Sequence, residues 1–366
     1  MRLALVHDWL NQVGGAEGVL QHLVGLFPKA PIYTSMYWPG AMPPSYRQWD
    51  IRTSWIDRLP GVKSHHQLFL PLYPLAFESF DLGGYDVVLS NKSGFCHGVI
   101  TPPETLHVCY CLTPTRYVWR YHDYARRERL GLVARVVLAP ILSNMRVWDR
   151  LAADRVDHFI AISAEVQRRI AKYYRRDSDI IYPPVETRRF TLASSCDDYF
   201  LVVGRLIPYK RIDLAVLACT RLAVPLKVGG VGRDLARLKA MAGPTVEFLG
   251  RVPDGFLPDL MARCKAFLFP GGEDFGIAPL EAMAAGRPVI AYAYGGALDT
   301  VIEGVSGTLF RQQTVESLID ALQRFDADLY DPLVIRRHAE QFDVAVFRQK
   351  MADYIAGACE EHKRWS

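Results

Sequence analysis

The chain has 366 residues, half of them hydrophobic and 22% charged, with a formal net charge of +4. This length suggests about two domains with a large core, and the composition excludes a largely disordered chain. No apolar stretch reaches the roughly 18 residues of a membrane span; the nearest, 132–142, is shorter and contains Arg135. The apolar run at residues 3–6 is too short for a signal peptide, so we expect a cytoplasmic protein.

The seven cysteines form no Cys-x-x-Cys pair and show no regular spacing, which favours reduced, buried thiols over a disulfide framework or a zinc site. The charge is uneven, because residues 116–176 contain fourteen Lys or Arg but only six Asp or Glu. A basic face of this kind attracts anionic lipid, a phosphorylated substrate or nucleic acid, or is simply solvated. No nucleic-acid-binding motif accompanies it, so we expect no nucleic acid partner.

The hydrophobic pattern of the N-terminal half predicts an α/β domain. A strand at 3–6 is followed by a glycine turn and a helix over 16–27, and further buried strands are expected at 87–90, 108–111 and 159–163. Continuous apolar runs that alternate with helices are typical of parallel sheets covered on both faces. The tandem prolines 183 and 184 disfavour helix and predict a domain boundary there.

A second α/β series begins after the prolines. Its expected strands are 199–203, 226–228, 246–249, 266–269 and 289–291, its helices are 211–222, 233–241, 255–263 and 277–285, and a closing helix covers 344–362. The fold class is therefore α/β, with two Rossmann-like domains whose parallel sheets face each other across a cleft. Ligands of such sheets bind beyond the carboxyl ends of the strands.

Glycines follow the first strand of each domain. Gly14 and Gly15 precede a helix, where free amides suit an anion or where the chain simply turns. Position 19 is valine, so the third glycine of a dinucleotide fingerprint is missing. Gly204 opens the segment GRLIPYKR, in which Arg205 and Lys210 can converge on one anion.

A third segment combines carboxylates with a helix start. Glu273 and Glu281 are separated by seven residues, and a helix beginning at Gly276 would place Pro279 in its first turn, where proline is tolerated. The amides at the start of this helix then lie unpaired at the positive end of its dipole. Because Glu281 lies more than one turn inside the helix, the two carboxylates can flank an elongated ligand, although a cap and a surface residue are the alternatives.

Three segments, GGAE at 14–17, GRLIPYKR at 204–211 and EDFGIAPLEAMAAGRPVIA at 273–291, together resemble the retaining glycosyltransferases of family 4. They occur in the family's order, and the resemblance covers essentially the whole chain. It implies the GT-B fold, with an acceptor-binding domain at 1–183, a nucleotide-sugar-binding domain at 184–343 and a crossover helix within 344–366. Relatives that look most similar use GDP-mannose in bacterial surface polysaccharide synthesis, often on a lipid carrier, which places the protein at the inner face of the membrane.

The resemblance also implies residue roles. Arg205 and Lys210 match the pair that neutralises the donor diphosphate, Glu273 lies near the sugar hydroxyls, and Glu281 matches the residue that binds the ribose. The remaining donor-side matches are Gly14, Gly15, Gly204, Val252 (a base contact), Phe275, Gly276, Ile277 and Ala278. Two cations and a helix N-terminus can offset the charge of a departing diphosphate, so we expect no metal and no cofactor beyond the nucleotide-sugar substrate.

The acceptor side is less defined. Asp8, His97 and Arg116 follow expected strands and are candidate acceptor contacts, while Leu112 stands where many relatives have histidine. The arginines at 116, 120, 126, 127 and 129 could meet a lipid pyrophosphate or an anionic membrane, or belong to an ordinary amphipathic helix. Three alternatives stay open: a UDP-sugar-dependent transferase with the same site, a non-catalytic nucleotide-sugar-binding member, which Leu112 favours, and a nucleotide-sugar epimerase, against which the glutamate pair argues.

Overall fold

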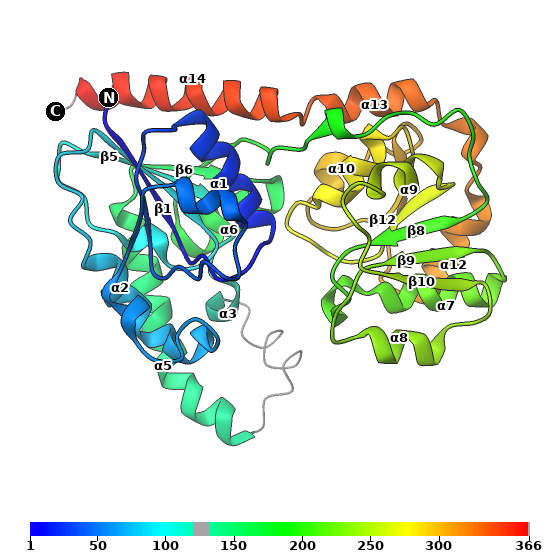
Figure 1. Cartoon of the computed structure of the whole chain (residues 1–366), viewed down its shortest axis with the longest axis horizontal. Helices are drawn as coiled ribbons and strands as arrows, with labels where there is room; N and C mark the ends of the chain where they lie inside the picture. The colour runs from blue at the N-terminus through cyan, green and yellow to red at the C-terminus, as the bar shows by residue number, and fades with distance from the viewer. Residues whose placement is uncertain (120–131, 365–366) are drawn as a thin grey trace. The chain divides into compact units, whose positions relative to one another are not determined.

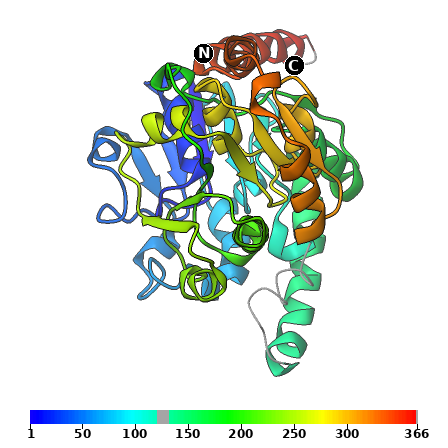
Figure 2. The same cartoon turned by 90° about the vertical axis from the view of Figure 1, so that its right-hand side faces the viewer.

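The computed structural model describes residues 1–119 and 132–364. It contains two α/β units, one formed by Met1–Tyr182 with Phe347–Ser366 and the other by Pro183–Val346. Each unit is a parallel sheet with helices on both faces (Figures 1 and 2). This confirms the α/β class expected from continuous apolar runs alternating with helices.

The first unit has a seven-stranded parallel sheet in the order β3-β2-β1-β4-β5-β6-β7. Its strands are β1 (Leu3–His7), β2 (Ile32–Thr34), β3 (Ile51–Thr53), β4 (Val87–Lys92), β5 (Leu106–Cys111), β6 (His158–Ala161) and β7 (Asp179–Ile180). The α-helices of this unit are α1 (Gly15–Leu26), α2 (Tyr73–Glu78), α3 (Arg116–Trp119), α5 (Leu132–Ala152), α6 (Ala164–Tyr174) and α14 (Val344–Lys363), whose first residues belong to the second unit. The strand order reverses between β1 and β4, which places the carboxyl ends of those two strands at the switch point.

The closing helix α14 packs on the sheet of the first unit through one stripe of side chains. Phe347, Met351 and Ile355 are buried along this stripe, spaced four residues apart. The Phe347 ring meets Tyr110 of β5 edge-on, and the Tyr354 hydroxyl donates a hydrogen bond to Asp179 at 3.0 Å. These contacts tie a segment from the end of the chain to strands far earlier in the sequence (Figure 1).

The second unit has a six-stranded parallel sheet in the order β10-β9-β8-β11-β12-β13. Its strands are β8 (Phe200–Val203), β9 (Leu226–Gly229), β10 (Val246–Gly250), β11 (Ala266–Phe269), β12 (Val289–Tyr292) and β13 (Gly307–Phe310). Its α-helices are α7 (Ile212–Leu222), α8 (Leu235–Met241), α9 (Leu257–Arg263), α10 (Ile277–Ala284), α11 (Ala297–Thr300), α12 (Val315–Arg324) and α13 (Pro332–Glu340). Here the switch point lies between β8 and β11, so the segments that follow Val203 and Phe269 begin side by side.

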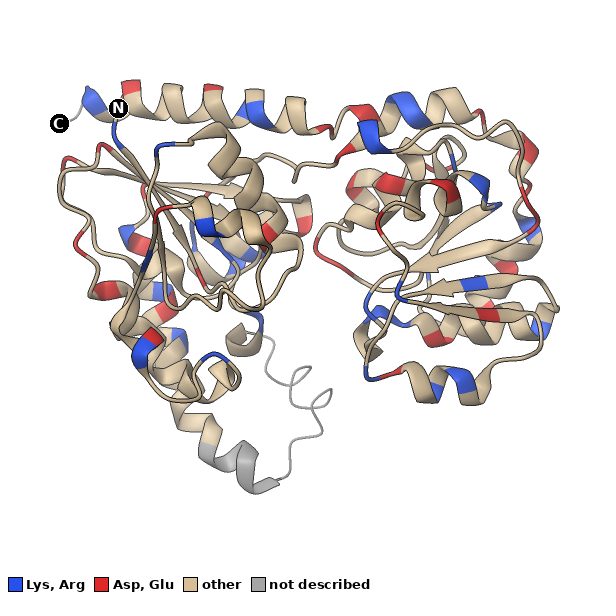
Figure 3. Cartoon of the chain, in the orientation of Figure 1, with Lys and Arg blue, Asp and Glu red and all other residues tan. Residues whose placement is uncertain are grey.

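Most described cations of the basic stretch are held by neighbours within the first unit. Arg155 pairs with Glu78 at 2.7 Å, Arg168 and Arg169 both pair with Glu165, and Arg146 donates to the Val118 carbonyl at 2.8 Å. Figure 3 shows both signs of charge over the described part of the chain. Arg120, Arg126, Arg127 and Arg129 lie outside the described residues. Among the described residues, no helix combines the length and apolar character needed to cross a membrane.

Candidate active site

The first element of the site is the turn that follows β8. Gly204 follows the strand, and a short 3-10 helix, Pro208–Lys210, brings the Lys210 side chain back toward it. A side-chain carbon on Gly204 would lie 3.2 Å from Nζ of Lys210. Arg205 is exposed, and its guanidinium pairs with no carboxylate among residues 1–119 and 132–364. The carboxyl end of β8 therefore presents two cations.

The second element is the segment between β11 and α10. Glu273 lies in this segment, and its Oε1 is 2.7 Å from Nζ of Lys210; the two side chains are 21% and 19% exposed. This ion pair joins the ends of two adjacent strands at the switch point. The sequence predicted both residues at one ligand, but it did not predict their direct contact.

Helix α10 begins at this pair without a capping side chain. Gly276 is its N-cap residue and supplies no capping side chain, and the first amides of the helix include those of Ile277 and Ala278. Phe275 is buried and packs near Phe342 at 6.1 Å between ring centres. An eight-residue helix with uncapped amides offers hydrogen-bond donors and a positive dipole end next to Glu273.

Glu281 lies on the second turn of α10 and is half-buried. Burial raises the pKa of its carboxyl, Arg189 opposes this increase, and Asp254 and Glu186 add to it. Arg189 also donates to the Asp254 carbonyl at 3.2 Å. Arg189 could not be predicted from the sequence, because it lies on a 3-10 helix, Thr187–Arg189, 92 positions before Glu281, with no motif around it.

Val252 lies beside the carboxyl ends of β9 and β10. A side-chain carbon on Gly229 would come within 2.8 Å of the Val252 side chain, which is half-buried. The adjacent Gly230 amide donates to the Gly250 carbonyl at 2.6 Å. Val252 thus belongs to the same edge of the sheet as Gly204, as its sequence position after a strand predicted.

In the first unit, Gly14 is the N-cap residue of α1, and the helix has no side-chain cap. The buried Glu17 carboxylate points back toward this turn: Oε2 would lie 3.1 Å from a side-chain carbon on Gly14, and Oε1 lies 3.6 Å from Nε2 of His7. A side-chain carbon on Gly15 would meet nothing within 4 Å. The helix start thus already has a carboxylate of its own.

Asp8 is fully buried, and both of its oxygens accept hydrogen bonds from the loop after β4. The amides of Ser93, Gly94 and Phe95 donate at 2.6 Å each, and that of Cys96 donates at 2.8 Å. Four backbone donors on one carboxylate hold this loop in place. In this conformation Asp8 does not reach an acceptor; it acts as a cap, which is the alternative that its position after a strand allows.

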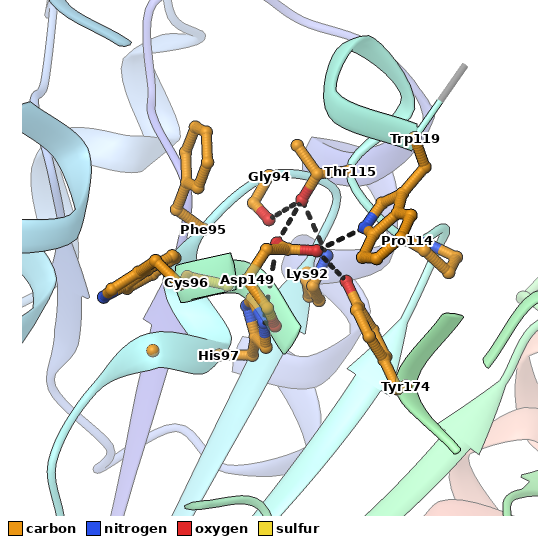
Figure 4. A network of polar contacts seen from close by, with 12 residues as sticks. Lys92, Gly94, Phe95, Cys96, His97, Pro114, Thr115, Trp119, Asp149 and Tyr174 are labelled. Carbon is orange, nitrogen blue, oxygen red and sulfur yellow. Dashed lines mark hydrogen bonds and ion pairs between the residues drawn. The ribbon is translucent and has the colours of Figure 1, made fainter. Parts of the chain in front are cut away.

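His97 is also fully buried, within a network centred on Asp149 of α5 (Figure 4). Its Nε2 lies 3.2 Å from the Asp149 carbonyl, and its ring stacks on Tyr174. The Asp149 carboxylate lies within hydrogen-bonding distance of Thr115 Oγ1, Trp119 Nε1 and the Tyr174 hydroxyl, at 2.7, 2.6 and 2.8 Å.

Lys92 completes this network from the end of β4, where it is fully buried. Its Nζ donates to Thr115 Oγ1 at 3.2 Å and to the Thr113 carbonyl at 3.3 Å. Burial opposes its charged form, but Asp149 and the other acidic groups around it raise its pKa overall. The network anchors the segment that leads to exposed Arg116 and contains buried Leu112. His97 is therefore part of the scaffold in this conformation and is not open to an acceptor.

Burial of two histidines predicts acid sensitivity of the first unit. Desolvation lowers the pKa of His97 to about 3 and that of His107 to about 4, from an ordinary value of 6.5. At a pH between the folded pKa of each histidine and 6.5, the unfolded state therefore binds more protons than the folded state. The free energy of unfolding falls as the pH drops below 6.5. We expect each buried histidine to lower the free energy of unfolding by about 2 kcal/mol at pH 5 relative to pH 7. Urea unfolding at both pH values measures this; His107→Gln should reduce the loss, and the exposed His65→Gln should not.

Comparison with known proteins identifies the second unit. Residues 186–337 match the family model "Glycosyl transferases group 1". The second unit belongs to this family. The O-antigen chain mannosyltransferase RfbU of Salmonella typhimurium is 28% identical in an alignment that covers 57% of this chain and 62% of RfbU. The glycogen synthase of Pseudomonas aeruginosa is 28% identical in an alignment that covers 78% of this chain and 56% of the synthase. The chain thus spans little more than half the length of these curated relatives.

The whole chain resembles the glycosyltransferase fold. The crystal structure of HepE from Anabaena in complex with UDP superposes with a TM-score of 0.73 at 18% identity, covering 98% of this chain and all of HepE. The fold is therefore GT-B, as the three sequence segments implied. Within the group 1 unit, Gly204, Arg205, Lys210, Val252, Glu273 and the start of α10 all lie at the carboxyl edge of one sheet.

Proposed function

We propose that the chain is a retaining glycosyltransferase that moves a hexose from a nucleotide diphosphate sugar to an acceptor. The observation that carries the proposal is the Lys210–Glu273 ion pair at the switch point of a group 1 unit, beside exposed Arg205 and the uncapped start of α10. Cations and oriented amides at one edge favour a diphosphate. A lysine ammonium has three donors, so Lys210 can contact the diphosphate while it pairs with Glu273.

Each donor-side residue then has a distinct role. Arg205 and Lys210 stabilise the negative charge that builds on the departing diphosphate, and the amides of Ile277 and Ala278 add to this stabilisation. Glu273 accepts hydrogen bonds from the sugar hydroxyls, and Glu281 accepts them from the ribose. Val252 contacts the base. This set of charges requires no metal ion and no cofactor.

The transfer follows from this charge arrangement. The bond between the anomeric carbon and the diphosphate oxygen breaks, and the acceptor oxygen forms a bond to the same carbon on the same face. The acceptor proton passes to the leaving phosphate oxygen. Asp8 and His97 are buried, so neither serves as a base in this conformation, and Leu112 has no titratable group. Proton transfer to the leaving group needs no base at these three positions.

We infer GDP-mannose as the donor and a glycan or lipid-linked oligosaccharide as the acceptor, in surface polysaccharide synthesis. The similarity to an O-antigen chain mannosyltransferase supports this choice. A UDP-sugar is the second candidate, because the similar HepE structure holds UDP. Arg116 is exposed at the end of the segment held by the Asp149 network, which is consistent with contact to an acceptor phosphate or to the anionic inner face of a membrane.

Proton nuclear magnetic resonance of the product tests the reaction. With GDP-mannose and a polysaccharide repeat-unit acceptor, the new anomeric signal should have the configuration of the donor. Glu273→Ala should lower turnover at saturating and at limiting donor, whereas Glu247→Ala, an exposed glutamate of the same unit, should not. If Glu273→Ala turns over as fast as the parent protein under both conditions, the proposed site is wrong.

Glu281 links the site to stability. Its pKa is raised by burial, so the folded state binds its proton more tightly, and ionisation of this carboxyl costs stability as the pH rises through the folded value. We expect Glu281→Gln to raise the thermal unfolding midpoint at pH 7 while weakening nucleotide-sugar affinity about tenfold or more. Differential scanning calorimetry and isothermal titration measure the two effects. A lower midpoint, or unchanged affinity, would contradict this role.

A further inference from the structure

We propose that Gln313 is a positioning residue that sets the geometry of the Lys210–Glu273 pair, an inference that rests on the proposed function. Gln313 lies between β13 and α12, and its Nε2 donates to the Pro270 carbonyl at 3.0 Å. Pro270 is the first residue after β11 and leads directly to Glu273. The Gln313 amide therefore holds the segment that carries the carboxylate.

The other end of the Gln313 side chain faces the turn that carries the cation. Its Oε1 accepts from Nη1 of Arg211, the residue after Lys210, at 3.4 Å. The Arg211 guanidinium is itself held by Asp213, with Nε 3.1 Å from Oδ1. A single amide thus bridges the two segments that bear Lys210 and Glu273, and its donor and acceptor ends serve one segment each.

The backbone of Arg211 supports this reading. Its φ of +50° lies in the left-handed region, which favours glycine, although arginine occupies the position. A glycine there would relieve the strain but would lose both the Asp213 and the Gln313 contacts. The strained residue is thus also the one that connects the turn to Gln313.

Direct packing couples the two segments as well. A side-chain carbon on Gly271 would lie 2.9 to 3.1 Å from the backbone atoms O, Cα and C of Lys210. The contacts therefore close a ring that runs from Lys210 through Arg211, Gln313 and Pro270 to Glu273, and back across the 2.7 Å ion pair. Removing Gln313 opens this ring on the side opposite to the ion pair, so the pair loses one of the constraints on its geometry.

Two variants of Gln313 test the bridge. Gln313→Ala should lower kcat about three- to tenfold at saturating donor, while KM for the acceptor stays unchanged. Gln313→Glu keeps an acceptor for Arg211 but has no donor for the Pro270 carbonyl, so it should lower kcat by as much as Gln313→Ala does. The exposed neighbour Gln312→Ala is the matched control and should keep the parent kcat. Parent kcat in both Gln313 variants would overturn the proposal.

Arg211→Gly separates positioning from stability. Relief of the left-handed strain should hold or raise the thermal unfolding midpoint, while kcat falls as it does in Gln313→Ala. If the thermal unfolding midpoint and kcat fall together, the role of Arg211 is merely structural and the proposal is overturned. If the parent protein transfers no sugar, the proposed function fails separately. A crystal structure of Gln313→Ala then decides: a longer separation of Lys210 Nζ and Glu273 Oε1 supports the proposal, and an unchanged 2.7 Å overturns it.

Discussion

Lys210→Ala is expected to lower kcat/KM by about 10- to 100-fold, because it removes a charge-assisted contact to the departing diphosphate. The same change leaves the partly buried Glu273 carboxylate without its 2.7 Å partner. Lys210→Arg keeps the charge but not the compact ammonium, so it should restore only part of the activity. Steady-state kinetics at varied donor concentration measures kcat/KM of the parent protein, Lys210→Ala and Lys210→Arg.

A double-mutant cycle separates the pair from its members. Since Lys210 and Glu273 are in contact, the losses in the single alanine variants should not add in the double variant. Lys239→Ala removes an exposed lysine of the same unit and should leave kcat/KM unchanged. Additive losses, or a Lys210→Ala variant within threefold of the parent, would show that the ion pair has no part in the reaction.

Gly295→Ala is expected to lower kcat about 100-fold by moving Glu273, and to lower the unfolding free energy by about 2–4 kcal/mol. Gly295 has a φ of +64°, and a side-chain carbon there would lie 2.1 Å from the Glu273 carbonyl oxygen, which is too close for any contact. The next residue, Gly296, donates its amide to the same carbonyl at 3.0 Å. The chain after β12 therefore supports the segment that carries Glu273.

Gly304→Ala is the matched control for this steric effect. Gly304 has a similar φ of +73°, but a side-chain carbon there would meet nothing within 4 Å. Its substitution should cost only the backbone strain, about 1–2 kcal/mol, and should leave kcat unchanged. Urea unfolding and steady-state rates of both variants measure the difference. Equal activity in the two variants would mean that the Gly295 contact does not position Glu273.

The central strands could be predicted because buried parallel strands are apolar throughout. The runs expected at 87–90 and 266–269 correspond to β4 and β11, and the helix expected at 277–285 corresponds to α10. The missed strands are β2, β3, β7 and β13, which have two to four residues each, and β3, β7 and β13 form edges of their sheets. Such short segments have too few residues for an alternating or continuous apolar pattern to stand out.

Within the site, sequence could predict which residues follow strand ends, since parallel topology gathers those ends at one edge. It could not predict partners that lie far along the chain. Asp8 meets amides about 85 positions later, and Gln313 meets Pro270 across 43 positions. Neither position has a local motif. His97 was likewise expected as an acceptor contact, but Asp149 of α5, 52 positions later in the chain, lies against its buried ring.

We would first measure thermal unfolding of the full chain with GDP, UDP, GDP-mannose and UDP-glucose. A ligand at a hundred times its dissociation constant should stabilise the folded state by about 2.7 kcal/mol. We expect a clear shift with GDP and GDP-mannose and none with the UDP compounds, and we expect Lys210→Ala to reduce the shift. A shift with the UDP compounds alone would show that the donor is a UDP-sugar and not GDP-mannose. No shift with any nucleotide would contradict a nucleotide-sugar site at Lys210 and Glu273.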